Sequence, residues 1–290
     1  MADFLRQTAK SNGIPLTHAA LVLPSTEVFT RELVMPAMTE QQLLYNLPYE
    51  FRDYLTEEKN KYFFDYSMRE VLRDESGQPT EMNLLACATL KSTVESYRTM
   101  LRRAGFRLRV LTPSECAYSA VLQAYYRRTQ QEGHDLCVVN LGHSATFLYI
   151  YRGGHFASRR EIEVGMSDLE HLVADQCSVD VHVAHEYVRQ NYNHVLESEQ
   201  ARELYGRIAV EVVKAVNFFN YNNRERELTQ LCLCGGGSAI QPLYDTITDT
   251  TGMTLHTSAE LLGQRMSTEE PWMYLRAIGG VDLGIKGGLR

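Results

Sequence analysis

The chain has 290 residues, enough for two modest domains or one large one. Its net charge of −7 gives no sign of a nucleic-acid-binding surface. No window is apolar for long enough to span a bilayer, and the N-terminus lacks a signal peptide's apolar region, so we expect membrane association only through a partner. The six cysteines show no Cys-x-x-Cys spacing, which favours reduced, buried thiols in a cytosolic protein over disulfides or a zinc site.

The first half alternates predicted strands and capped helices. A helix is expected over 3–12, then strands at 19–23 and 28–34. Thr39-Glu40-Gln41-Gln42 is a capping box, and Pro48 lies inside the apolar pattern that follows it, so we expect a kink or a break there. The remaining expected elements are strands at 62–68, 83–90 and 108–111, a polar turn at 74–80, and helices capped by Ser92-x-x-Glu95 and by Thr112-Pro113-Ser114-Glu115.

The polar stretch 129–134 is the best candidate for a linker to a second half. This half opens at 136–150 with a strand, a turn at Gly142 and a second strand that can pair back on the first. The elements expected after it are a strand at 156–164, a helix capped by Ser167-x-x-Glu170, helices at 181–191 and 199–221, a strand at 228–233, a helix at 238–248, a strand at 254–256 and a helix at 271–278 that ends at Gly279-Gly280.

A glycine triplet follows the strand Leu231-Cys232-Leu233-Cys234. Gly235, Gly236 and Gly237 lead into Ser238, which opens an amphipathic segment. Glycine lets a backbone turn sharply and approach a ligand closely, and a helix that begins after such a turn points N–H groups at a nucleotide or phosphate. A tight connection without a ligand is the alternative interpretation of an isolated triplet.

A second glycine turn lies about ninety residues upstream, at Asn140-x-Gly142-x-x-x-Thr146. A hairpin turn with glycine and small hydroxyls, here with His143 and Ser144 inside it, can wrap backbone N–H groups around terminal phosphates. A simple tight hairpin is the alternative. On the long predicted helix, Glu211 and Lys214 face the same way at i and i+3, either as part of this site or only as a surface ion pair.

Three other features have simpler interpretations. His182-x-x-His185-Glu186 lacks the spacing of a metalloprotease helix and a third ligand, so we interpret it as a solvated face. Cys232 and Cys234 alternate on one strand and fit buried thiols. Arg98, Arg102 and Arg103 form a basic helix end, which favours the helix dipole; binding of a partner's acidic tail is the alternative.

The order of the two glycine turns resembles the actin-like ATPase superfamily. Asn140-x-Gly142-x-x-x-Thr146 is similar to the superfamily's Asp-x-Gly-x-x-x-Thr phosphate turn except at the acid, and the triplet is similar to the segment that holds the adenosine. The resemblance implies ribose contacts at Glu211 and Lys214. It also implies that Gly279, in the closing Ala277-Ile278-Gly279, packs beside the nucleotide.

Within the superfamily the chain resembles the PilM family, cytoplasmic components of type IV pilus and type II secretion-like assembly systems. The resemblance is carried by Leu33-Val34-Met35-Pro36 and the capped helix after it, by Tyr97 with Gly105, and by Arg160-Glu161-Ile162-Glu163-Val164-Gly165. It implies an α/β, ribonuclease H-like fold with a first lobe at 1–130, a small α+β insert at about 37–110, and a second lobe at 131–290.

The same resemblance implies ATP with Mg²⁺ as cofactor. As partner it implies the cytoplasmic tail of a PilN-like inner-membrane component, which would hold the chain at the inner face of the membrane; oligomerisation is left open. Two departures bear on these expectations. The chain starts after the hairpin that carries a first Asp-x-Gly turn in the family. Asn140 replaces the acid expected to hold the metal's water shell.

An amide supplies no charge to Mg²⁺, and phosphoryl transfer depends on charge neutralisation. We therefore expect an assembly adaptor without catalytic or metal-ligating side chains of its own. One alternative is a small-molecule kinase, which needs a carboxylate base, and Asp168 is the candidate. The other is a cell-division actin homologue, which would need a basic amphipathic helix where the short, glycine-rich segment 284–290 lies.

Overall fold

The computed structural model describes residues 1–131, 133–265 and 270–286. The chain forms two compact units, one of Met1–Ala120 with Arg276–Arg290 and one of Val121–Leu275. The described residues 276–286 thus belong to the N-terminal unit, whereas the second lobe was expected to extend over 131–290. The predicted linker at 129–134 and the segment 284–290 each include residues outside the described ranges.

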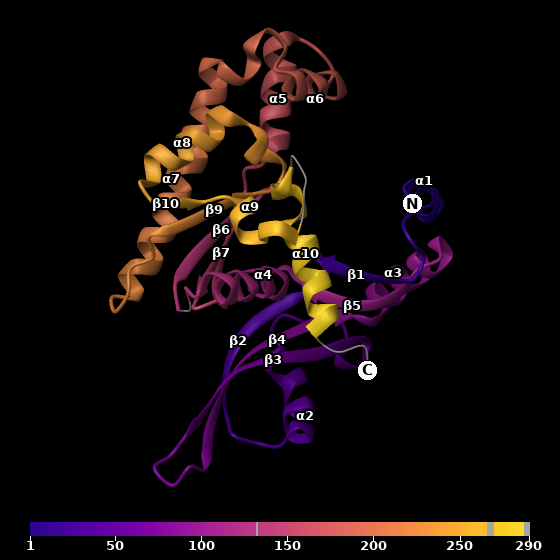
Figure 1. Ribbon diagram of the computed structural model, residues 1–290, viewed down its shortest axis with the longest axis vertical. Helices are drawn as coiled ribbons and strands as arrows, with labels where there is room; N and C mark the ends of the chain where they lie inside the picture. Colours follow the sequence, from indigo (N-terminus) through magenta and orange to yellow (C-terminus); the bar gives the residue numbers. More distant parts are fainter. Residues whose placement is uncertain (132, 266–269, 287–290) are drawn as a thin grey trace. The chain divides into compact units, whose positions relative to one another are not determined.

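The N-terminal unit contains two small sheets (Figure 1). β1 (His18–Leu23) and β5 (Arg107–Pro113) pair in parallel, and β2 (Phe29–Pro36), β4 (Pro79–Leu90) and β3 (Tyr62–Arg73) form an antiparallel sheet in that order. β2 pairs with β4 along its whole length, so the insert's sheet begins before residue 37. The helices that belong wholly to this unit are α1 (Ala2–Ser11), α2 (Glu40–Glu50) and α3 (Lys91–Ala104), with η1 (Lys59–Lys61) between α2 and β3.

α2 supplies the core of the antiparallel sheet. Thr39 accepts from the Gln42 N–H while the Gln42 side chain accepts from the Thr39 N–H, so the predicted capping box is confirmed. Leu43 and Leu47 are buried against the sheet. The helix continues through Pro48 but ends at Glu50, because proline removes one hydrogen bond of the last turn.

The C-terminal unit is built on a five-stranded sheet of order β10-β9-β6-β7-β8. β6 (Asp135–Leu141) pairs antiparallel with β7 (Thr146–Arg152) and parallel with β9 (Gln230–Cys234). β8 (His155–Ile162) and β10 (Thr254–His256) are the edges. The other elements of this unit are α5 (Met166–Cys177), α6 (Val181–Gln190), η2 (Tyr192–Glu197), α7 (Glu199–Asn222), η3 (Gly236–Ala239), α8 (Gln241–Thr251), α9 (Ser258–Leu262) and η4 (Gly263–Arg265).

Two helices cross the boundary between the units along the chain, α4 (Ser114–Thr129) and α10 (Pro271–Lys286). The core of the C-terminal unit joins sheet residues such as Val139 and Leu148 to Leu169 of α5, Val212 of α7 and Leu243 of α8. Within the described ranges, no helix is both long and apolar enough to cross a membrane.

Several predicted helix starts and ends were wrong. α3 begins at Lys91 with Leu90 as its N-cap and no side-chain cap, because β4 runs directly into the helix and leaves Ser92 inside it. α5 begins at Met166, and its cap is the Gly165 N–H donating to Asp168 Oδ2 over 2.8 Å.

The expected helix at 238–248 starts later, at Gln241, because the triplet forms the 3₁₀ turn η3 first. α10 continues through Gly279-Gly280, where the missing side chains let the helix pack closely on Ala117 and Val22.

Candidate functional site

The two glycine turns of the C-terminal unit lie side by side. β6 and β9 are parallel neighbours, with Asn140 opposite Cys234, so both turns leave the same edge of the sheet. Ligands of open α/β sheets bind at this carboxyl edge. A Cβ atom at Gly235 would lie 2.5 Å from Asn140 Oδ1 and 2.6 Å from the Leu141 carbonyl oxygen. The close approach of the turns therefore depends on glycine at position 235.

The predicted phosphate turn follows β6. The Gly142 N–H donates to the carbonyl groups of Asn140 and Ala145. His143 and Ser144 are exposed, and within the described part of the chain their N–H groups donate to no recorded acceptor. Thr146 is fully buried, and its hydroxyl donates to the Val164 carbonyl over 2.9 Å. Thr146 thus holds the turn, while the backbone N–H groups of His143 and Ser144 have no acceptor among the described residues.

The start of α5 orients this turn. The Met166 and Ser167 N–H groups donate to the carbonyl oxygens of Gly142 and His143, over 3.0 and 2.8 Å. In a trans peptide the N–H points opposite to the C=O of the same peptide plane. Since the Gly142 and His143 carbonyls face α5, the N–H groups of His143 and Ser144 point away from it. Because Gly165 has no side chain, the backbone of the turn can occupy the space beside it.

A buried carboxylate connects the turn to α6. Glu170 Oε1 lies 2.8 Å from His185 Nδ1 and 3.7 Å from His143 Nδ1, and the Glu170 side chain is 9% exposed. The Ser167-x-x-Glu170 spacing predicted only a helix cap for Glu170. His185 is exposed, as its interpretation as part of a solvated face requires, but its contact with Glu170 was not predicted. No local pattern could have found it, because α5 and α6 bring the two residues together. Within the described residues, no group of His, Cys, Asp and Glu is arranged to hold a metal ion.

The glycine triplet is fixed on most sides. The Gly235 N–H donates to the Trp272 carbonyl over 3.2 Å, and the Ser238 hydroxyl donates to the Gly235 carbonyl over 2.6 Å. Gly237 is buried against Leu141. Gly236 is exposed, and a Cβ atom there would meet nothing within 4 Å. Gly236 is therefore the open position of the triplet, while the Ser238 side chain stabilises the turn through its hydrogen bond to Gly235.

The other predicted site residues are not brought to the triplet by any recorded contact. Glu211 and Lys214 form an exposed ion pair of 2.7 Å with each other on α7. Gly279 belongs to the N-terminal unit, where it packs on Ala117. The roles that the resemblance implies for these three residues remain predictions.

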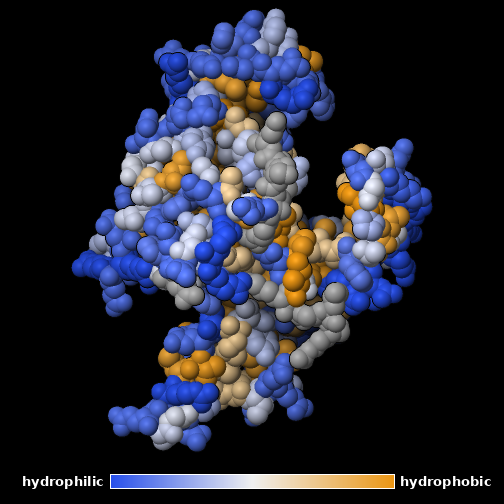
Figure 2. Space-filling view, in the orientation of Figure 1, coloured by the Kyte–Doolittle hydropathy of each residue, from blue (hydrophilic) through white to orange (hydrophobic). Residues whose placement is uncertain are grey.

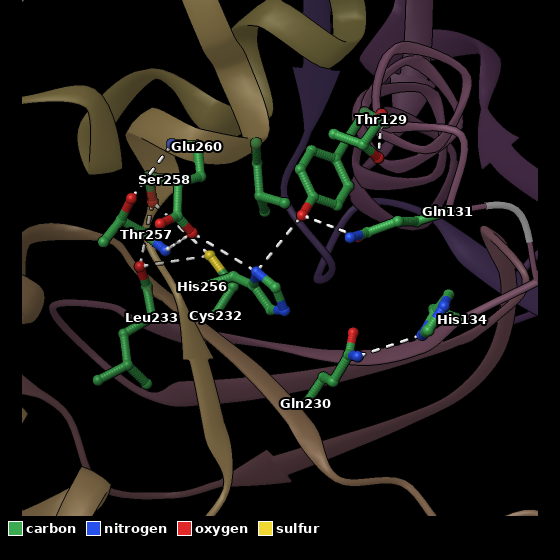
Figure 3. A network of polar contacts seen from close by, with 12 residues as sticks. Thr129, Gln131, His134, Gln230, Cys232, Leu233, His256, Thr257, Ser258 and Glu260 are labelled. Atoms are coloured by element: carbon green, nitrogen blue, oxygen red, sulfur yellow. Dashed lines mark hydrogen bonds and ion pairs between the residues drawn. The ribbon is translucent and has the colours of Figure 1, made fainter.

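A pocket of about 530 Å³ adjoins the triplet, with Ser238, Tyr244 and Trp272 in its lining. Another part of its lining is the segment after β10, which a polar network holds in place (Figure 3). His256 Nδ1 lies 3.5 Å from both Glu260 Oε2 and Tyr125 Oη. The Ser258 hydroxyl donates to the Leu233 carbonyl over 3.1 Å. This network ties the pocket wall to β9 and α4.

Cys232 also lies in the network, 3.8 Å from the Ser258 hydroxyl. Both Cys232 and Cys234 are buried free thiols, which confirms the prediction made for them.

Comparison with known proteins supports the fold. The family model described as type IV pilus assembly protein PilM matches residues 1–270. A solved PilM-PilN type IV pilus biogenesis complex contains a chain with 19% identity and a TM-score of 0.75, and the match covers 99% of this chain and 85% of that one. This likeness confirms the predicted actin-like α/β fold.

More distant structures are ethanolamine utilization protein EutJ from Carboxydothermus hydrogenoformans and Ta0583, an archaeal actin homolog. The match to the first has 14% identity and a TM-score of 0.48, and it covers 67% of this chain and 62% of the EutJ chain. The match to the second has 13% identity and a TM-score of 0.48, and it covers 76% of this chain and 91% of the Ta0583 chain. A search of curated proteins finds no match. On the extent of the family match, the chain belongs to the PilM family of type IV pilus assembly proteins.

Proposed function

We propose that this chain is a non-catalytic assembly adaptor at the inner face of the membrane, where it binds the cytoplasmic tail of a PilN-like membrane protein. Membership of the PilM family supports this proposal, as does the likeness to a chain from a PilM-PilN complex. The rival function, a small-molecule kinase, needs a free carboxylate base. The candidate base, Asp168, accepts the Gly165 N–H as the cap of α5, which disfavours that role.

We further propose that ATP binds at the carboxyl edge of β6 and β9. The observation that carries this is the pair of N–H groups at His143 and Ser144, which point away from α5 on the turn that contacts Gly235. Such successive N–H groups form a concavity suited to anions. Asn140 offers Mg²⁺ an amide instead of a carboxylate, so the site supports binding better than hydrolysis.

Calorimetric titration of Mg-ATP tests the nucleotide site. Gly236→Glu places a carboxylate in open space at the triplet, so the variant should fold and lose binding. Gly206→Glu is the matched control, because Gly206 also has nothing within 4 Å and lies on α7. Asn140→Asp should strengthen binding only when Mg²⁺ is present. Equal binding by Gly236→Glu and the wild type would place the nucleotide elsewhere, and no binding by any of these proteins would refute the ATP proposal.

The adaptor proposal needs a separate measurement. A fluorescent peptide with the sequence of the cytoplasmic tail of a PilN-like protein from the same organism is titrated with the chain, with and without Mg-ATP. Saturable binding is expected whether or not the nucleotide site is occupied. Failure to bind, alongside normal binding of a tail by a known PilM protein, would overturn the adaptor role while leaving the nucleotide result intact.

A further inference from the structure

A basic pocket lies in the N-terminal unit, apart from the glycine turns. Its volume is about 860 Å³, and it is lined by α3, the start of β1 and the start of β5. Four of its lining residues are arginines: Arg98 and Arg102 from α3, and Arg107 and Arg109 from β5. Leu108 is among its apolar lining residues, so the cationic side chains adjoin an apolar surface.

Local geometry brings the four arginines together. Arg98 and Arg102 are four residues apart on α3 and share one face of the helix. Gly105, with a φ of 99°, ends α3 in the left-handed conformation and returns the chain into β5. Arg107 then pairs with His18 of β1, and the register shifts beyond this pair, beside Arg109.

These charges are only partly compensated within the protein. Residues 1–20 and 91–110 hold eight lysines and arginines but only two carboxylates, a net charge of +6 in a protein whose net charge is −7. Arg98 pairs with Glu95 over 3.2 Å. In the part of the chain that the structure describes, the guanidinium groups of Arg102, Arg107 and Arg109 have no recorded ion pair or hydrogen bond. Figure 2 shows hydrophilic surface beside hydrophobic side chains over α1 and α3.

We infer that this pocket docks an acidic segment of a partner protein. Guanidinium groups bind carboxylates through two parallel hydrogen bonds. The four exposed guanidinium groups around this pocket repel one another, and a bound anion would compensate that repulsion. The volume lies within the range of binding pockets and accepts a few side chains. Apolar lining residues such as Leu108 suit aliphatic side chains between the carboxylates, whereas a bilayer would present a flat surface to the pocket.

The test uses a fluorescein-labelled peptide of about twelve residues with the repeat Asp-Glu-Leu, and the same peptide with the repeat Asn-Gln-Leu as the neutral control. Fluorescence anisotropy should show that only the acidic peptide binds, and that binding weakens as salt is raised. Arg102→Glu with Arg107→Glu should weaken binding at least about tenfold, because the two substitutions remove charge-assisted hydrogen bonds and place carboxylates that repel the acidic peptide.

Arg202→Glu with Arg207→Glu on α7 makes the same change in net charge on exposed side chains of the other unit and should leave binding unchanged. Equal urea midpoints for the two double variants exclude misfolding as the cause of a difference. Equal loss of binding in both would show an effect of net charge alone and overturn the pocket. Binding to phosphatidylglycerol vesicles but not to the acidic peptide, lost only in Arg102→Glu with Arg107→Glu, would overturn the peptide assignment in favour of a membrane contact.

Discussion

Replacing Gly235 with alanine should destabilise the C-terminal unit, whereas the same change at the neighbouring Gly236 should not. Gly235 has φ 85° and ψ 170°, a region that residues with a side chain avoid at a cost of about 1–3 kcal/mol. The added Cβ would also lie 2.5 Å from Asn140 Oδ1 and 2.6 Å from the Leu141 carbonyl oxygen. Overpacking of this kind costs about another 1–3 kcal/mol.

The sum, about 2–6 kcal/mol, is a large share of the 5–15 kcal/mol that typically separates folded from unfolded protein. At Gly236 the new methyl group meets nothing within 4 Å. Alanine also lowers the conformational entropy of the unfolded chain, which should stabilise the folded state by up to about 1 kcal/mol. Two adjacent glycines of one turn should thus give opposite signs.

Urea unfolding followed by tryptophan fluorescence measures this difference. Trp272 is the single tryptophan, and its carbonyl accepts the Gly235 N–H, so the signal reports the unit that contains the triplet. With a slope of about 2 kcal/mol per molar urea, the Gly235→Ala midpoint should fall by about 1–3 M. A Gly235→Ala midpoint equal to that of the wild type, or an equal fall in Gly236→Ala, would refute the contact between the two turns.

Three further outcomes follow from buried groups. Ser258→Ala should lower the free energy of unfolding by about 1 kcal/mol in the same urea assay, since it removes the hydrogen bond to the Leu233 carbonyl, and no change would contradict that bond. Leu47→Ala should cost about 2–5 kcal/mol and speed hydrogen exchange in α2 and the antiparallel sheet; unchanged exchange there would count against the core described around α2. Burial raises the pKa of Cys87 and of Cys116 to about 12, so native alkylation at both should be slow at pH 8 and rise about tenfold per pH unit; a rate that levels off near pH 9 would contradict the raised pKa.

Elements whose signals are local were predictable from the sequence. The Thr39 capping box forms because its hydroxyl and amide lie within one helical turn. Gly105 ends α3 because glycine adopts the left-handed conformation at low cost. The hairpin of β6 and β7 around Gly142 was also predictable, since its apolar runs and its turn residues are local.

Features that depend on neighbouring elements could not be predicted in this way. Ser92 has the capping spacing, but Leu90 is still in β4 when α3 begins, so the strand sets the start of the helix. Glu170 has the same spacing after Ser167, yet its carboxylate meets His185 from the next helix. The Trp272 carbonyl that holds Gly235 lies far along the chain. In each case the neighbouring element belongs to the same unit as the residue, and its position decided the outcome.

The basic end of α3 permits a direct choice between the two interpretations that the sequence left open. Arg103 lies in the last turn of α3 and does not line the pocket, while Arg107 lines the pocket and lies on β5. A cation in the last turn stabilises a helix by about 0.3–1 kcal/mol at low salt. If the basic residues only stabilise the helix dipole, Arg103→Ala should lower the free energy of unfolding by that amount. Arg107→Ala should then change neither the stability nor the binding of the acidic peptide.

If the pocket binds acidic segments, the two substitutions separate binding from stability. Arg107→Ala should weaken binding of the Asp-Glu-Leu peptide and leave the urea midpoint unchanged or slightly higher, because it removes one of four charges that repel one another. Arg103→Ala should lower the midpoint at low salt and leave peptide binding intact. Unfolding and anisotropy measurements on the same two proteins decide the matter. Loss of peptide binding in Arg103→Ala with none in Arg107→Ala would place the binding surface on the helix end and outside the pocket.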